Sequence, residues 1–260
     1  MPAAARRVVG VASRAFLWWP APSTFVNDGV ISTGCAPLND LLDGGFERGT
    51  VTQVYGAPAA GKTNVALSAS AAVAANDGLV VYVDTEGLSL DRFEAVASAA
   101  ADDADRELDA VTGNVVVKDA LDFDEQAEAV QDVSEFAAQA DLVVVDSITG
   151  FYRLERGNDV EGGDSLRAVA NQVTHLLGLA RRHDLAVVVT NQVFSDPDSD
   201  RTRALGGHTL EHWTGTVVRV DRYRGGNRKA TLEKHRAKPA GESVQFHITD
   251  TGIAGGESGP

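Results

Sequence analysis

The chain has 260 residues, of which 37 are acidic and 23 are lysine or arginine, so its net charge is -14. This length fits one sizeable α/β domain with its own core. The only cysteine, Cys35, excludes an intrachain disulfide and a cysteine-based zinc site. No apolar run approaches the ~20 residues of a membrane span. A lone thiol fits a reducing compartment, so we expect a cytoplasmic protein with no membrane contact.

The acidic, lysine-poor composition is typical of proteins from cells that keep molar salt in the cytoplasm. Screening lengths there fall to about 3 Å, which makes self-repulsion of an acidic surface tolerable. An ordinary acidic cytosolic protein is the alternative interpretation. We favour a halophilic source.

The two ends of the chain differ in character from the middle. Residues 1–29 contain a basic start and an interrupted apolar run without a convincing cleavage site. We interpret them as a disordered extension or as the product of an upstream start codon. Residues 30–250 form the predicted folded core, and the glycine-rich residues 251–260 are a predicted disordered tail.

A β-branched stretch over 50–55 predicts a strand, and small helix formers over 64–75 predict a helix. Between them lies a segment that fits the phosphate-binding pattern G-x-x-x-x-G-K-[ST] at every fixed position. Backbone N–H groups of such a loop and the positive end of the following helix cradle phosphates. Lys62 would reach the β- and γ-phosphates, and the Thr63 hydroxyl would ligate Mg²⁺. The sequence therefore predicts an ATP site made by Gly56, Ala57, Pro58, Ala59, Ala60, Gly61, Lys62 and Thr63.

The remainder of the core alternates apolar strands with helical stretches. Strands are expected at 79–84, 114–117, 142–146 and 185–190, and helices at 88–101, 123–139 and 164–183. Continuous valine-rich strands in β-α-β order are typical of a parallel sheet buried on both faces. Strands at 215–223, 229–235 and 243–248, with a turn at 224–227, indicate an antiparallel C-terminal extension. The predicted fold class is α/β, with a mostly parallel, doubly wound sheet.

Polar residues follow three of these strands, at the edge that also carries the phosphate loop. Asp146 ends a buried strand and fits the second acid of a phosphate-loop ATPase, on the metal side. Glu86 could orient and deprotonate the attacking water, a role that its position alone does not decide. Asp84 would join the metal shell or only end its strand. Gln192 could sense the γ-phosphate, or it could cap a turn.

Eight basic residues and two acidic ones lie between Arg219 and Lys238, a local charge of +6. A basic island on an acidic chain suggests an anionic partner, either nucleic-acid phosphate or the nucleotide of a neighbouring subunit. A solvated hairpin would have the same composition, so both interpretations stay open.

Taken together, these segments resemble the RecA/RadA recombinase superfamily, and the match is close to an archaeal branch of paralogues. The order and spacing of the matching segments cover residues 31–250. The segments are 32–46, Gln53–Thr63, Tyr82–Gly87, Leu142–Ser147, Thr190–Val193 and Leu205–His212.

The resemblance implies a RecA-like ATPase core that uses ATP and Mg²⁺. It implies that Glu86 is the catalytic carboxylate, acting with Lys62, that Asp146 is the second acid on the metal side, and that Gln192 is the γ-phosphate sensor. It also implies DNA binding by two loops, one over 153–167 and one after Gln192. The arginines that these loops would contribute are Arg153, Arg156, Arg167, Arg201 and Arg203.

Two departures from the superfamily pattern bear on function. RadA carries a helical DNA-binding domain before its core, whereas only about thirty unpromising residues precede the core here. The segment after Gln192 is acidic and lacks the paired aromatic residues of a strand-exchange loop. Both departures favour a DNA repair and recombination accessory protein with weak ATPase activity and no strand exchange.

Such a protein would bind single-stranded or branched DNA and assist RadA. A Holliday-junction resolvase and a second copy of the chain are further candidate partners. An autonomous, DNA-stimulated strand-exchange recombinase is one alternative. A KaiC-like regulatory ATPase that does not bind DNA is another, although the Gly206-Gly-His208 segment favours a recombinase.

Overall fold

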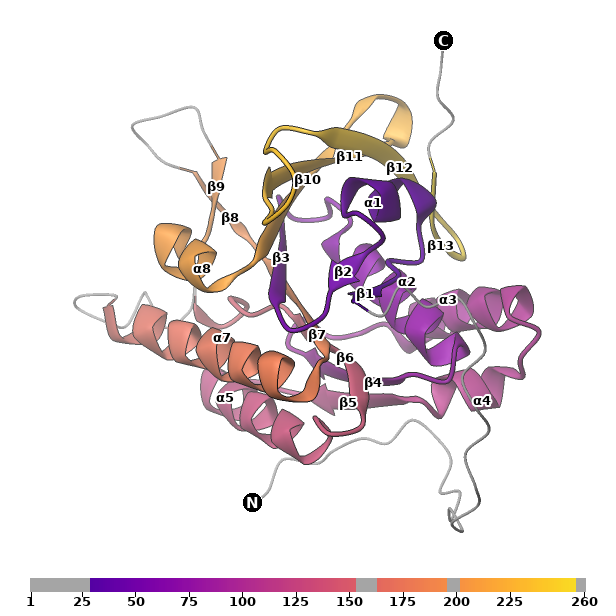
Figure 1. Cartoon of the computed structure of the whole chain (residues 1–260), viewed down its shortest axis with the longest axis horizontal. Helices are drawn as coiled ribbons and strands as arrows, with labels where there is room; N and C mark the ends of the chain where they lie inside the picture. The colour runs from indigo at the N-terminus through magenta and orange to yellow at the C-terminus, as the bar shows by residue number, and fades with distance from the viewer. Residues whose placement is uncertain (1–28, 153–162, 196–201, 256–260) are drawn as a thin grey trace.

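The computed structural model describes residues 29–152, 163–195 and 202–255. Its helices and strands alternate along most of the chain (Figure 1). The helices are α1 Ala36–Leu41, α2 Lys62–Ala75, α3 Leu90–Asp103, α4 Leu108–Thr112, α5 Phe123–Asp132, α7 Gly163–His183 and α8 Gly207–Trp213, with short 3-10 turns at Val133–Glu135 and Arg224–Gly226. The strands are β1 Val30–Ile31, β2 Phe46–Glu47, β3 Val51–Tyr55, β4 Leu79–Asp84, β5 Val115–Asp119, β6 Ala140–Asp146, β7 Ala186–Asn191, β8 Val193–Ser195, β9 Thr202–Ala204, β10 Thr216–Arg222, β11 Arg228–Lys234, β12 Ser243–Thr249 and β13 Gly252–Gly255.

One large sheet organises the described residues. Its strand order is β13-β12-β11-β10-β3-β7-β6-β4-β5. Every neighbouring pair from β10 to β5 is parallel, and every pair from β10 to β13 is antiparallel. Because β6 and β7 lie between β3 and β4, the carboxyl ends of these parallel strands meet at one edge, next to the loop that follows β3.

Helices cover both faces of the sheet (Figure 1). Alternate residues of a strand point to opposite faces, so Val80 and Tyr82 pack in one core cluster while Val81 and Val83 pack in the other. The first cluster also contains side chains from α1, α2, α3 and α4, and the second contains side chains from α5, α7 and α8. This arrangement confirms the predicted fold class, a mostly parallel, doubly wound sheet with an antiparallel C-terminal extension.

Two predicted segments differ in the structure, and short elements such as α4 and α8 were not predicted. The predicted helix over 123–139 ends at Asp132 and continues as a 3-10 turn, because the chain must reverse to begin β6 at Ala140. Part of the predicted disordered tail is strand β13, which pairs with β12 and buries Ile253 in the core. The sequence prediction missed this strand because glycine dominates the segment and Ile253 is its single large apolar residue.

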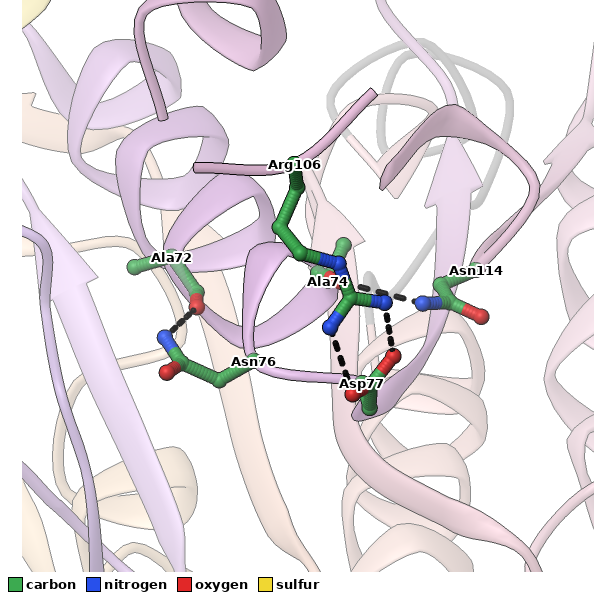
Figure 2. A network of polar contacts seen from close by, with 6 residues as sticks. All are labelled: Ala72, Ala74, Asn76, Asp77, Arg106 and Asn114. Atoms are coloured by element: carbon green, nitrogen blue, oxygen red, sulfur yellow. Dashed lines mark hydrogen bonds and ion pairs between the residues drawn. The ribbon is translucent and has the colours of Figure 1, made fainter. Parts of the chain in front are cut away.

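Helix α2 ends on the side of the sheet where the parallel strands begin, opposite the phosphate loop. Polar groups there satisfy the last carbonyls of the helix (Figure 2). The side-chain amides of Asn76 and Asn114 donate to the carbonyls of Ala72 and Ala74, at 2.7 and 3.0 Å. Asp77, whose φ is 65°, turns the chain toward β4 and receives two hydrogen bonds from Arg106. These contacts fix the C-terminal end of the helix whose N-terminal end lies at the candidate site.

No helix in the described ranges combines the length and the apolar composition needed to cross a bilayer.

Candidate nucleotide-binding site

The loop between β3 and α2 is held in shape by two glycines. A Cβ atom on Gly56 would lie 2.1 Å from the carbonyl oxygen of Val220, so only glycine allows β10 to pass this close. Gly61 has a φ of 111°, a left-handed conformation that L side chains rarely adopt, and it directly precedes α2. The loop thus brings the first turn of α2, with its unpaired N–H groups, to the carboxyl edge of the sheet.

Lys62, the first residue of α2, is 7% exposed. Its Nζ donates to the carbonyl oxygens of Gly56 and Ala57, both at 3.2 Å, so the ammonium group lies across the loop. Burial lowers the pKa of Lys62, and the nearby carboxylates of Glu86 and Asp146 partly offset that effect. A buried cation whose hydrogen bonds go to neutral carbonyls suits an anionic ligand that supplies the missing charge.

Asp146, the last residue of β6, is 2% exposed. Its Oδ2 accepts a hydrogen bond from the Tyr82 hydroxyl at 2.8 Å, and its Oδ1 accepts one from the Thr190 hydroxyl. Burial raises the pKa of Asp146, while hydrogen bonds from Thr190, Thr63 and Tyr82 oppose that shift. The predicted metal ligands Thr63 and Asp146 are therefore in contact.

Glu86 lies in the turn after β4, where Asp84 fixes the backbone. The carboxylate of Asp84 accepts hydrogen bonds from the amides of Glu86 and Gly87, both at 3.1 Å, and from the amide of Leu88. The second predicted role of Asp84, ending its strand, thus matches its contacts. Gln192 Nε2 donates to Glu86 Oε1 at 3.1 Å, which joins the two predicted catalytic side chains.

Gly61, Lys62, Thr63, Glu86 and Gln192 line one cavity of about 360 Å³, and Asp146 contacts Thr63 without lining it. The donors on its walls fit a triphosphate with a divalent cation: a loop shaped by glycine, one ammonium group, and a hydroxyl beside a buried carboxylate. In the described part of the chain, no group of three or more His, Cys, Asp or Glu side chains lies together as a metal site would require. A cation here would therefore take further ligands from the phosphates, as Mg²⁺ usually does. The cavity is lined by Pro58, Ala59, Gly61, Lys62, Thr63, Asn64, Glu86, Gln192, Arg228 and Ile248.

Sequence reasoning missed the residue between Thr190 and Gln192. Asn191 is fully buried, its Oδ1 accepts from the Thr149 hydroxyl at 2.6 Å, and its Nδ2 donates to the carbonyl of Leu205 at 2.8 Å. Its own carbonyl accepts from the amide of Gly56 at 3.3 Å. Asn191 thus links the phosphate loop to the segment that follows β9. An amide-bearing side chain at the end of a fully apolar strand was the signal that could have found it.

The wall formed by Arg228 and Ile248 was also missed. These residues come from β11 and β12, more than 160 positions after the phosphate loop. Their approach depends on the antiparallel extension folding back over α2, for which the local sequence carries no signal.

The two predicted DNA-contacting arginines that the structure describes, Arg167 and Arg203, do not line the nucleotide cavity. Arg167 lies in the second turn of α7, where its 74% exposed side chain contacts Asp164 at 3.0 Å, and Arg203 is exposed on β9. The remaining three, Arg153, Arg156 and Arg201, lie outside the described residues. Strands β8 and β9 form an antiparallel pair that begins one residue after Gln192.

The fold and the site together define a RecA-like phosphate-loop protein, and comparisons with known proteins agree. The Rad51 family matches residues 28–255. The DNA repair and recombination proteins RadB of two Halobacterium salinarum strains are 66% identical over 229 residues, which is 87% of this chain and 95% of each relative. RadB of Archaeoglobus fulgidus is 39% identical over 86% of this chain and 97% of that protein. A crystal structure of the RadB recombinase, 34% identical, has a TM-score of 0.73 and covers 88% of this chain and 100% of that one.

The chain belongs to the Rad51 family and, within it, to the group of archaeal RadB proteins. The Halobacterium relatives also support the haloarchaeal source that the composition predicts. ATP binding with Mg²⁺, ATP hydrolysis and DNA binding are typical of the family.

Proposed function

We propose that this chain is an ATP-binding accessory protein of DNA repair and homologous recombination, with slow ATP hydrolysis and no strand exchange. The observation that carries the proposal is the convergence of Lys62, the Thr63–Asp146 pair and the Glu86–Gln192 pair on one cavity. The relatives are DNA repair and recombination proteins, which supports this biological setting.

The phosphate loop would bind the phosphates of ATP through its backbone amides and Lys62. Thr63 and Asp146 would hold Mg²⁺, which neutralises the charge that develops on the phosphates during transfer. Lys62 is already placed over the loop by its bonds to Gly56 and Ala57, so it would exchange carbonyl partners for phosphate oxygens.

Glu86 would orient the attacking water and accept its proton. Its turn is fixed by Asp84, but one carboxylate oxygen already accepts a hydrogen bond from Gln192. Glu86 must retain or exchange this bond when water and a terminal phosphate enter. The competition between Gln192 and the attacking water for the Glu86 carboxylate supports slow turnover. Because Gln192 directly precedes β8, the same bond would also link the nucleotide state to the β8–β9 pair.

DNA would bind at the loops that include Arg153, Arg156, Arg167, Arg201 and Arg203. The exposure of Arg167 and Arg203 supports this assignment, and the acidic composition after Gln192 argues against strand exchange. In molar salt, contacts to phosphate weaken steeply, so base stacking and hydrogen bonding would supply much of the affinity. RadA is the proposed partner whose activity the protein assists; a Holliday-junction resolvase and a second copy of this chain are secondary candidates.

DNA binding and the effect on RadA test this proposal together. Fluorescence anisotropy with single-stranded and branched DNA in multimolar KCl should show binding that the double variant Arg167→Ala, Arg203→Ala weakens several-fold. Arg106→Ala, which removes an exposed arginine at the opposite edge of the sheet, is the matched control. Addition of the protein should raise the rate of RadA-catalysed strand exchange, whereas the protein alone should exchange no strands.

Two results would replace the proposal. Strand exchange by the protein alone would make it an autonomous recombinase. ATP binding with no DNA binding at any salt concentration would favour the KaiC-like regulatory ATPase.

A further inference from the structure

Four of the eight basic residues between Arg219 and Lys238 are accounted for by contacts within the fold. Arg219 pairs with Asp221 and Glu233, and Arg236 pairs with Glu47. Lys234 and Lys238 donate to backbone carbonyls at the ends of α8 and α1, at distances between 2.5 and 3.1 Å. Three of these four cations, Lys234, Arg236 and Lys238, therefore fasten the C-terminal extension to the remainder of the domain.

Two of the other four basic residues are arginines that lie opposite each other in the hairpin. Arg222 of β10 and Arg228 of β11 are direct cross-strand partners. Like charges directly opposite each other destabilise a sheet. No ion pair within the described ranges includes either side chain. This hairpin end therefore concentrates positive charge that its own fold leaves uncompensated.

Both arginines lie against the phosphate loop. Arg222 Nε is 3.4 Å from the carbonyl oxygen of Ala59. Arg228 lines the cavity, and its Cγ lies 3.7 Å from where a Cβ atom on Gly61 would be. The hairpin thus adds a cationic wall to a cavity whose loop already carries Lys62.

The guanidinium group of Arg228 is held by one of its nitrogens only. Its Nη1 donates to the carbonyl oxygens of Gly226 and Asn227, at 2.6 and 3.2 Å. Its Nε is buried without a hydrogen-bond partner, and Nη2 has no acceptor among the described residues. A guanidinium presents its Nε and Nη2 donors as a fork that matches two oxygens of a phosphate. Nη2 can therefore donate to a phosphate group, and the full fork can do so once the side chain turns its buried Nε into the cavity.

The position of this wall indicates which phosphate it would meet. The sheet order places β10 and β11 on one side of β3, and β7, β6 and β4 on the other. Glu86 and Gln192, which would act at the terminal phosphate, belong to the second side. Arg228 therefore lies toward the part of the nucleotide away from the γ-phosphate.

We infer that Arg228, with Arg222 beside it, binds the α- and β-phosphates of the nucleotide in the same subunit. This inference rests on the proposed ATP binding and gives the antiparallel extension a specific part in it. ATP and ADP share these phosphates, so the arginine contributes to both affinities and does not distinguish the two nucleotides.

Calorimetric titration with ATP and with ADP, in multimolar KCl with Mg²⁺, tests the inference. Arg228→Ala is expected to raise the Kd of ATP and of ADP by about tenfold each, the scale of one lost charge-assisted bidentate contact. Arg224→Ala removes an equal charge from the turn of the same hairpin, outside the cavity lining, and is expected to leave both values unchanged.

Each other outcome overturns the inference. Unchanged Kd values for Arg228→Ala would do so, as would a loss confined to ATP, or an equal loss in Arg224→Ala. Failure of the unsubstituted protein to bind either nucleotide would refute the proposed function as well, so the two failures are distinguishable. Thermal unfolding followed by circular dichroism checks that Arg228→Ala is folded. If it is not, Arg228→Lys keeps the charge but lacks the fork, and a smaller, parallel loss for ATP and ADP is expected.

Discussion

Acidic residues have different surroundings at the carboxyl ends of the parallel strands, where the phosphate loop lies, and on the opposite side of the sheet. At the phosphate-loop edge, Asp84 and Asp146 are buried, and backbone amides, hydroxyls and a phenol donate to them. On the opposite side of the sheet, Asp77 pairs with Arg106 (Figure 2) and Asp141 pairs with Arg48, and both carboxylates lie closer to solvent.

This difference matters in a chain of net charge -14 that works in concentrated salt. Exposed ion pairs contribute little to stability, and molar salt screens them further. Buried carboxylates with neutral donors are screened much less, so the geometry of the site persists where surface pairs fade. We therefore expect substitutions on the phosphate-loop side of the sheet to have large effects and those on the opposite side to have small ones.

The largest effect on nucleotide affinity is expected for Lys62→Ala. Loss of the buried ammonium group should raise the Kd of ATP by about 10²-fold, because a charge-assisted contact to phosphate disappears from a partly desolvated site. Titration calorimetry measures the change. Lys229→Ala removes a lysine outside the cavity lining and should bind ATP like the unsubstituted protein. Equal ATP affinity in Lys62→Ala would contradict the assignment of the loop.

Glu86→Gln should separate binding from hydrolysis. The glutamine retains an oxygen that can accept from Gln192, but it cannot accept a proton from water, so turnover should fall by roughly 10²-fold or more. A phosphate-release assay at saturating ATP measures the rate, and calorimetry should show ATP bound with little loss. Unchanged turnover would remove Glu86 from the role of general base.

Asp146→Asn should stabilise the protein in the absence of Mg²⁺. Burial raises the pKa of Asp146 above the ordinary 3.8, so the ionised form opposes folding. That penalty grows as the pH rises from about 3.8 through the folded-state pKa, and it stays constant above it. Asparagine avoids the penalty, so at neutral pH the variant should have the higher free energy of unfolding.

Urea unfolding in EDTA, at neutral pH and at about pH 4, checks this prediction. The difference between the two proteins should shrink at the acidic pH. Addition of Mg²⁺ and ATP should stabilise the unsubstituted protein more than the variant. A variant that is less stable at both pH values would show that the carboxylate is needed for folding itself.

The smallest effect is expected for Arg106→Ala at the opposite edge. The ion pair with Asp77 lies at the surface, where molar salt screens it. Thermal unfolding in multimolar KCl should give the same midpoint for both proteins, and ATP binding should not change. A clear loss of stability would mean that this edge carries more of the fold than its exposure suggests.

Sequence reasoning predicted the fold where a periodic signal was present. The valine-rich strands and the phosphate-loop pattern define the parallel sheet and place Lys62, Glu86, Asp146 and Gln192 at one edge. Short elements were missed, since helices such as α4 and α8 span too few residues for a period to develop. The hairpin wall of the cavity was missed for a different reason: Arg228 reaches it only through strand pairing distant in sequence.

ATP turnover in multimolar KCl, with and without single-stranded DNA, is the measurement we would make first, with DNA binding followed in the same samples. We expect slow turnover that Lys62→Ala abolishes and that DNA does not stimulate, although DNA is bound. Strong stimulation by DNA would instead describe a recombinase that drives its own reaction, and the proposed accessory function would be wrong.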